Sequence, residues 1–97
     1  MYNVVLHREV TKALVKFPKK DQARLAAAIR ELGADPRPAG CVHLRETLYR
    51  IRVGEYRVLY AVSDKQLIIV VVKATRRSER TYAEIESLMA RARKLLD

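Results

Sequence analysis

The residues of this chain best suited to chemistry are three arginines, Arg50, Arg52 and Arg57, in the middle of the sequence. They lie between residues 48 and 62, where two alternating runs flank a Gly-Glu pair, a pattern typical of a β-hairpin. In the register that a two-residue turn sets, Arg52 pairs with Arg57. All three guanidinium groups then lie on one face, opposite the apolar residues. Such a face could bind a polyanion, because guanidinium groups form strong, often bidentate hydrogen bonds to phosphates.

The cost of this arrangement supports that interpretation. Like charges directly opposite each other across two strands destabilise a sheet by roughly 0.2–1 kcal/mol. The needs of the fold therefore do not explain the three arginines, whereas a polyanion lying across them would neutralise their charge. The alternative is that individual arginines pair with nearby carboxylates, such as those of Glu46 or Glu55.

Length and composition limit the class of protein. The chain has 97 residues, 49% of them hydrophobic, which favours a single folded domain over residues 1–97. Its formal charge of +9 favours an acidic partner, either a nucleic acid or an acidic protein. One cysteine, Cys41, excludes an intrachain disulfide and suits the cytoplasm. We expect no metal site, cofactor, signal peptide or membrane span, since the longest apolar run covers only residues 67–72.

The periodicity of apolar residues predicts the elements that position the arginines. A strand is expected over residues 2–6, helices over 8–17 and 20–32, a loop over 35–40 and a strand over 41–45. The hairpin follows, then an apolar strand over 67–74 and a helix over 79–96. The order β-α-α-β-β-β-β-α predicts an α+β domain. An N-terminal helical hairpin and a C-terminal helix would pack on a mostly antiparallel sheet.

A fourth arginine, Arg76, follows the apolar strand. If Val62 pairs with Leu67 across the preceding turn, Arg57 lies opposite Val72. By the same alternation, Arg76 projects to the face of Arg57, just beyond the end of the pairing. The alternative interpretation of Arg76 is a solvated surface charge.

The hairpin also carries a resemblance to a known family. The chain resembles the RelE/ParE superfamily of toxins from bacterial and archaeal toxin–antitoxin pairs, through YRIRVG at 49–54 and YRVLY at 56–60. Leu44-Arg45, the β-branched strand, and Arg76-Arg77 ahead of Tyr82 give weaker support. The resemblance spans residues 2–82, which is most of the chain.

The resemblance implies a fold like that of the small microbial ribonucleases, and a RelE-type toxin of a type II system. Such a toxin is an mRNA interferase, a metal-independent endoribonuclease that cuts mRNA in the ribosomal A site. In that reaction, the 2′-hydroxyl of the RNA attacks the adjacent phosphate. The resemblance also implies an acidic, RelB-like antitoxin partner. Carried over by position, the catalytic residues are Arg50, Arg52, Arg57, Arg76 and Tyr82. Neighbouring basic residues expected to contact RNA are Arg45, Lys73, Arg77 and Arg80.

The general base is not identified by the sequence. Many relatives have lysine where Arg50 and Arg52 stand, and arginine, which keeps its proton above pH 12, is a poor base. Where Ala74-Thr75 stands, many relatives have glycine and then histidine or lysine, which would be a proton carrier. His43 is a conceivable base, although a histidine on a strand is more often structural. Tyr82 could stack on a nucleobase of the RNA or orient the 2′-hydroxyl, or instead be a core residue at a helix start.

Two other functions remain open at this stage. A ParE-like toxin with the same fold poisons DNA gyrase without catalysis, although such chains usually lack this combination of basic residues and tyrosine. A catalytically weakened RNA binder would keep the charge and lose the chemistry, as the Ala74-Thr75 departure suggests. Codon preference, antitoxin identity and the docking of the C-terminal helix are not decided by the sequence.

Overall fold

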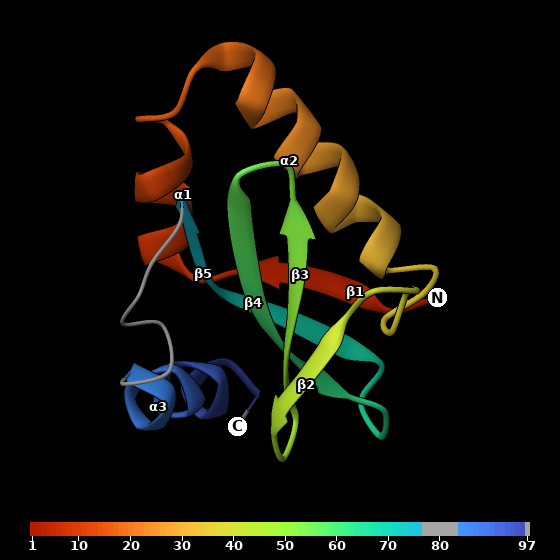
Figure 1. Ribbon diagram of the computed structural model, residues 1–97. Coiled ribbons are helices and arrows are strands. Elements are labelled where there is room, and N and C mark those ends of the chain that lie inside the picture. Colours follow the sequence, from red (N-terminus) through yellow and green to blue (C-terminus); the bar gives the residue numbers. More distant parts are fainter. Residues whose placement is uncertain (77–83, 97) are drawn as a thin grey trace.

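The computed structural model describes residues 1–76 and 84–96 and has the predicted order of elements (Figure 1). The boundaries agree with the sequence prediction within a few residues, except that the first helix is shorter. The C-terminal helix is described from residue 85 onward. The elements are β1 (Asn3–Leu6), α1 (Arg8–Leu14), α2 (Lys19–Leu32), β2 (Val42–Arg45), β3 (Leu48–Val53), β4 (Tyr56–Ser63), β5 (Ile68–Arg76) and α3 (Ile85–Leu96).

The five strands form one sheet in the order β1-β5-β4-β3-β2. Only the outer strand β1 runs parallel to its neighbour β5, and the other three pairings are antiparallel. β5 is therefore an inner strand, which explains why its first half is apolar on both faces. The predicted α+β class and the mostly antiparallel sheet are confirmed.

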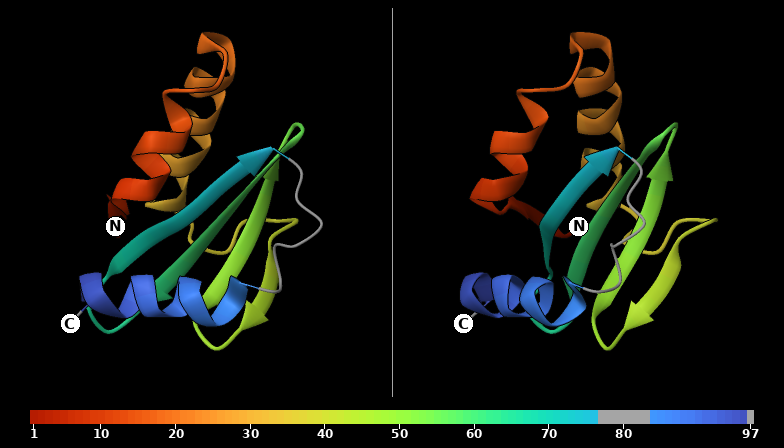
Figure 2. Two further views of the ribbon diagram at one scale, coloured as in Figure 1. Left: turned by 90° about the vertical axis from the view of Figure 1, so that its left-hand side faces the viewer. Right: turned by 60° about the vertical axis from the view of Figure 1, so that its left-hand side comes forward.

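Two layers of helix cover the sheet, one on each face. Figure 2 shows α1 and α2 on one side and α3 on the other. The α1/α2 side contains the larger core, which includes Leu25, Tyr60 and Ile69, all fully buried. On the other side, Leu88 of α3 packs with Leu59 and with further apolar residues of the sheet. Burying each such side chain contributes about 1.5–3 kcal/mol, so α3 is held by its own core.

The β3–β4 hairpin has the register that the sequence predicts. Val53 pairs with Tyr56, and Arg52 pairs with Arg57. The turn begins at Gly54, whose φ of 61° lies in the left-handed region that glycine adopts without strain. A Cβ at Gly54 would lie 2.6 Å from Nη2 of Arg24, so the α2 side chain lies directly against the turn.

The register between β4 and β5 differs from the prediction. Val62 pairs with Ile69, because Leu67, with a φ of 57°, belongs to the turn and not to the strand. Farther along, the pairing shifts by one residue, and Val72 becomes the extra residue of a β-bulge.

This bulge reverses the alternation for the last part of β5. Arg57 lies opposite Thr75, where the sequence had predicted Val72. Arg76 lies opposite Tyr56, a residue of the α1/α2 core. The side chains of β5 beyond the bulge therefore point to the faces opposite those that simple alternation predicts.

Candidate nucleic-acid interface

Arg50, Arg52 and Arg57 lie on one face of the sheet, as predicted; we call these three residues the basic face. Arg50 pairs with Leu59, whose side chain lies in the core beneath α3, and Arg52 pairs with Arg57. The basic face is therefore on the α3 side of the sheet. Figure 2 shows α3 crossing the part of the sheet far from the hairpin tip, so the helix leaves the strands near the tip uncovered.

Arg52 and Arg57 are close neighbours because of their place in the hairpin. The pair that flanks a two-residue turn exchanges hydrogen bonds, so the next pair, formed by these two arginines, is non-hydrogen-bonded. Cα atoms in such pairs are only about 4.5 Å apart. Arg52 is exposed and Arg57 is half-buried. The backbones of the two arginines thus lie side by side near the tip of the hairpin.

Among the residues that the structure describes, no carboxylate pairs with Arg52, so these residues do not support the alternative that carboxylates neutralise it. Within residues 1–76 and 84–96 its side chain forms no ion pair. Glu55, one of the two candidates, bonds instead to Arg76, with Arg76 Nη2 3.0 Å from Glu55 Oε2. Within the part of the chain that the structure describes, no carboxylate thus neutralises the exposed charge of Arg52.

The predicted place of Arg76 on the basic face is wrong. The bulge in β5 puts Arg76 opposite Tyr56, on the α1/α2 side of the sheet. There its hydrogen bond to Glu55 raises the pKa of Arg76. Next to it, the Tyr56 hydroxyl donates to Asp21 at 2.7 Å, which raises the pKa of Tyr56. Arg76 thus belongs to a polar cluster at the hairpin tip.

The same bulge brings another basic residue to the basic face. Lys73 lies opposite Leu59, so it points to the α3 side. Its ammonium group forms an ion pair with Glu84, and only 19% of its side chain is exposed. The Val72 carbonyl at the bulge accepts a hydrogen bond from Nη1 of Arg91 in α3, at 3.0 Å. The start and middle of α3 are thereby tied to the bulged strand.

Of the other predicted RNA contacts, Arg45 lies on the α3 side of the sheet and the rest fall outside the described residues. Arg45 is exposed at the end of β2, where its Nη1 lies 2.7 Å from Oε1 of Glu86 in α3. The charge of Arg45 is thus paired with a carboxylate of the C-terminal helix. Arg77, Arg80 and Tyr82 fall outside the described residues, and their roles remain predictions.

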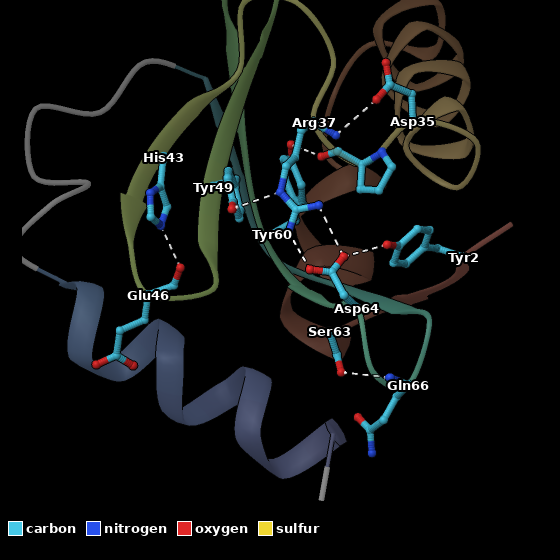
Figure 3. A network of polar contacts seen from close by, with 11 residues as sticks. Tyr2, Asp35, Arg37, His43, Glu46, Tyr49, Tyr60, Ser63, Asp64 and Gln66 are labelled. Atoms are coloured by element: carbon cyan, nitrogen blue, oxygen red, sulfur yellow. Dashed lines mark hydrogen bonds and ion pairs between the residues drawn. The ribbon is translucent and has the colours of Figure 1, made fainter.

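His43, the conceivable general base, lies on the opposite face from the basic face. It pairs with Tyr49, a residue packed against the α1/α2 core, and its ring stacks on Tyr49 with a centroid distance of 4.7 Å. Nε2 of His43 is hydrogen-bonded to the Glu46 carbonyl oxygen at 2.6 Å (Figure 3). These contacts favour the structural role, and the basic face contains no histidine among the described residues.

Sequence reasoning missed Arg37, which organises the loop between α2 and β2. Its guanidinium group lies 2.8 Å from Oδ2 of Asp64, and its Nε donates to the Tyr49 hydroxyl at 3.0 Å (Figure 3). The Tyr2 hydroxyl donates to the same Asp64 carboxylate at 2.5 Å. The bond from Arg37 lowers the pKa of Asp64 and raises that of Arg37. The only sequence signal was an arginine between two prolines.

Residues 1–76 and 84–96 contain no group of three or more His, Cys, Asp and Glu side chains that could hold a metal ion. No helix in the same residues has the length and apolar character needed to cross a membrane.

Comparisons with known proteins agree with this fold. A family model described as phage-derived protein Gp49-like matches residues 12–96. A RelE1 toxin homologue from Methanocaldococcus jannaschii is 30% identical over 81 residues, covering 78% of this chain and 90% of that protein. The RelE of an archaeal RelE–RelB complex from Pyrococcus horikoshii superposes with a TM-score of 0.74 at 34% identity, covering 80% of this chain and 97% of that one. The isolated Escherichia coli RelE toxin, at 19% identity and a TM-score of 0.70, covers 91% of this chain and 99% of that one and shares the fold.

Proposed function

Because this chain belongs to the RelE toxin superfamily, as a Gp49-like member, we propose that it is the toxin of a type II toxin–antitoxin pair and cleaves mRNA on the ribosome. The observation that carries this proposal is the basic face. Three arginines share one sheet face, two of them directly opposite each other, which costs stability and suits an RNA phosphodiester.

The proposed reaction needs no metal. The 2′-oxygen of one nucleotide attacks the adjacent phosphorus, a 2′-O–P bond forms, and the P–O5′ bond breaks. A base takes the proton of the 2′-hydroxyl, and the leaving 5′-oxygen receives a proton. Arg57 and Arg52 would bind the non-bridging oxygens and stabilise the charge that builds there, while Arg50 would anchor a flanking phosphate.

Proton transfer is the step that the basic face does not explain. A guanidinium group is a poor base, and the described residues of the basic face include no histidine, so this face can orient and stabilise but hardly act as a base. We therefore expect the base to come from Tyr82 or from the ribosome, and we expect free protein to cut naked RNA poorly. Arg76 does not enter the proposed site, since it bonds to Glu55 on the other side of the sheet.

The proposed partner is an acidic, RelB-like antitoxin. The RelE chains of Pyrococcus horikoshii and of the Mycobacterium tuberculosis RelBE2 complex were each solved with an antitoxin. A net charge of +9 on this chain suits an acidic partner that would cover the basic face. Such a pair would act in the cytoplasm, where translation takes place.

The test is translation of a defined mRNA by purified ribosomes, with cut sites mapped by primer extension. Wild-type protein should cut within the A-site codon, and Arg57→Ala should reduce cleavage by about 100-fold or more. Arg30→Ala is the matched control, because Arg30 is an exposed arginine on α2, away from the basic face. Inhibition of DNA gyrase without any loss of mRNA would contradict the proposal and favour a ParE-like toxin.

A further inference from the structure

A cleft of about 450 Å³ lies between α2 and the open end of β3. Ala28 and Glu31 of α2 line one wall, and Ile51 and Val53 of β3 line the other. The loop after α2, which Figure 1 shows turning back into β2 beside β3, completes the cleft with Asp35 and residues 38–40. The volume lies in the roughly 300–1,000 Å³ range of small-molecule sites.

Arg52 connects this cleft with the basic face. Its side chain lies on the α3 side of the sheet, and the residue also lines the cleft at the sheet edge. A phosphate bound by the Arg52 guanidinium would therefore leave its attached nucleoside at the mouth of the cleft. The cleft and the basic face, which lie on opposite sides of the sheet, thus share Arg52.

The backbone of Arg52 offers hydrogen bonds to this cleft. The Val62 amide donates to the Thr47 carbonyl at 3.0 Å. Because hydrogen-bonded pairs alternate along an antiparallel ladder, the backbone groups of the odd-numbered residues of β3 form the hydrogen bonds to β4. The N–H and C=O groups of Arg52 consequently point away from β4, toward the outer edge. β2 does not cover them, because its pairing with β3 ends at Arg50.

The polar groups at the cleft include two acidic side chains, beside the donor groups of Arg52. Glu31 and Asp35 carry carboxylates, which accept hydrogen bonds and do not donate them when ionised. Asp35 already accepts from the Arg37 backbone N–H at 3.3 Å, whereas Glu31 has no ion-pair partner among residues 1–76 and 84–96. A flat ring with an exocyclic amino group would satisfy these acceptors, while its faces contact Ile51 and Val53.

We propose that this cleft holds one base of the bound RNA and selects bases with an exocyclic amino group over those with a carbonyl in that place. The inference rests on the proposed function, since the basic face must hold the backbone of the same RNA. A peptide strand is a poorer occupant: β3 ends at Val53, so a paired peptide would meet the outward backbone groups of Arg52 alone.

Arg37 maintains the shape of this site. Through Asp64 and Tyr49 it fixes the loop that carries Pro38, Ala39 and Gly40 against the sheet. The cleft is thereby formed before a ligand arrives, which lowers the entropy lost on binding.

The test uses nucleoside monophosphates that differ in one functional group. CMP and UMP differ in the amino or carbonyl group at C4, and AMP and IMP differ in the same way at C6. Amide NMR of the wild-type protein should show CMP and AMP shifting the signals of Arg52, Ala39 and Gly40. Their Kd values should be about tenfold lower than those of UMP and IMP. The two nucleotides of each pair have the same ribose and phosphate. Contacts of the phosphate with the arginines therefore contribute equally to both Kd values and do not affect their ratio.

Two variants probe the cleft without touching an arginine. Glu31→Gln keeps the size of the side chain and removes its charge, and it should abolish the preference of CMP over UMP. Ala39→Trp should fill the cleft and stop the shifts at Arg52, and Ala39 is exposed, so the fold tolerates the larger residue. Glu46→Gln and Ala23→Trp are matched controls at exposed positions that do not line the cleft, and they should behave as wild type.

The outcomes separate the two proposals. Equal affinity for all four nucleotides, or a CMP preference that survives Glu31→Gln, would overturn the base site and leave the proposed cleavage standing if primer extension still shows cuts. Loss of the preference in Glu31→Gln, with cuts redistributed toward uracil in mapped mRNAs, would support it. Failure of any nucleotide to bind, together with intact mRNA, would overturn both.

Discussion

Arg52 faces Arg57 directly across the β3–β4 hairpin, in the closely spaced pair next to the turn. Neither the turn nor the core requires this pair, because both side chains lie on the face away from the α1/α2 core. The hairpin keeps two like charges together at a cost in stability, and the same spacing lets both groups reach one phosphate. The proposed function would thus be in conflict with stability at this one pair of residues.

The first prediction concerns that conflict. Arg52→Thr should raise the free energy of unfolding by about 0.5 kcal/mol, because it removes a like-charge pair and introduces a residue that favours strands. The same variant should bind single-stranded RNA more weakly. The logarithm of its association constant for RNA should fall less steeply with the logarithm of the salt concentration, with a slope smaller by about 0.7. Urea titration and RNA binding at several salt concentrations measure the two effects, and a variant that lost stability would contradict the argument.

The second prediction follows from the bulge in β5. Arg76→Ala should retain mRNA cleavage within about threefold of wild type, since Arg76 lies on the α1/α2 side in an exposed ion pair with Glu55. Glu55→Gln should likewise have little effect. Arg57→Ala, measured in the same primer-extension assay, supplies the contrast. Loss of cleavage in Arg76→Ala equal to that in Arg57→Ala would show that Arg76 leaves Glu55 to reach the RNA.

The third prediction is a pH dependence of stability from His7. Nδ1 of His7 accepts a hydrogen bond from the Glu9 amide at the start of α1, at 3.1 Å, and it can do so only when neutral. Burial, and secondarily the charge of Arg91, lower the pKa of His7. The unfolded chain therefore binds the proton first as the pH falls. The stability from His7 is fully present above about pH 6.5 and is lost as the pH drops through the lower folded value.

The control for this effect is His7→Asn, which can cap the helix without titrating. Between pH 7.5 and 5.5, wild type should lose up to about 1 kcal/mol relative to the variant, the usual contribution of an N-cap. Urea titrations at several pH values measure the difference. Parallel pH profiles for the two proteins would exclude the histidine as the cause.

The fourth prediction tests how α3 is attached to the sheet. Arg91→Met should keep most of the packing of the side chain, while the Val72 carbonyl loses its hydrogen bond from Nη1. The expected cost is about 1–2 kcal/mol, because the carbonyl of a buried residue is left without that donor. Arg93→Met is the matched control, since Arg93 is exposed on the same helix. Equal unfolding curves for the two variants would show that the bond contributes little.

The hairpin was predictable because its information is local. A glycine at the turn and strict alternation on both sides fix the register, and the structure has that register at every pair from Leu48 to Val53. The order of elements was predictable for the same reason, since each helix shows its apolar period within its own residues. Three of the predicted catalytic arginines therefore lie together as expected.

The position of Arg76 was not predictable because β5 gives no such signal. Residues 68–72 are all β-branched and apolar, so both faces look alike and a shift of one residue changes nothing in the pattern. The bulge at Val72 is stabilised from outside the strand, by Arg91 of α3. The network around Arg37 is equally hidden, because it joins residues from four separate segments of the chain.

The place of β5 between β1 and β4 has a consequence for how the protein is made. β1 has no neighbour in the sheet until β5 has been synthesised, so the sheet cannot close while residues 68–76 remain in the exit tunnel. Until then, the arginines of the hairpin lack the complete sheet that would position them to bind RNA as we propose. A form able to act on translation, as we propose, could therefore arise only after residues 68–76 have left the exit tunnel.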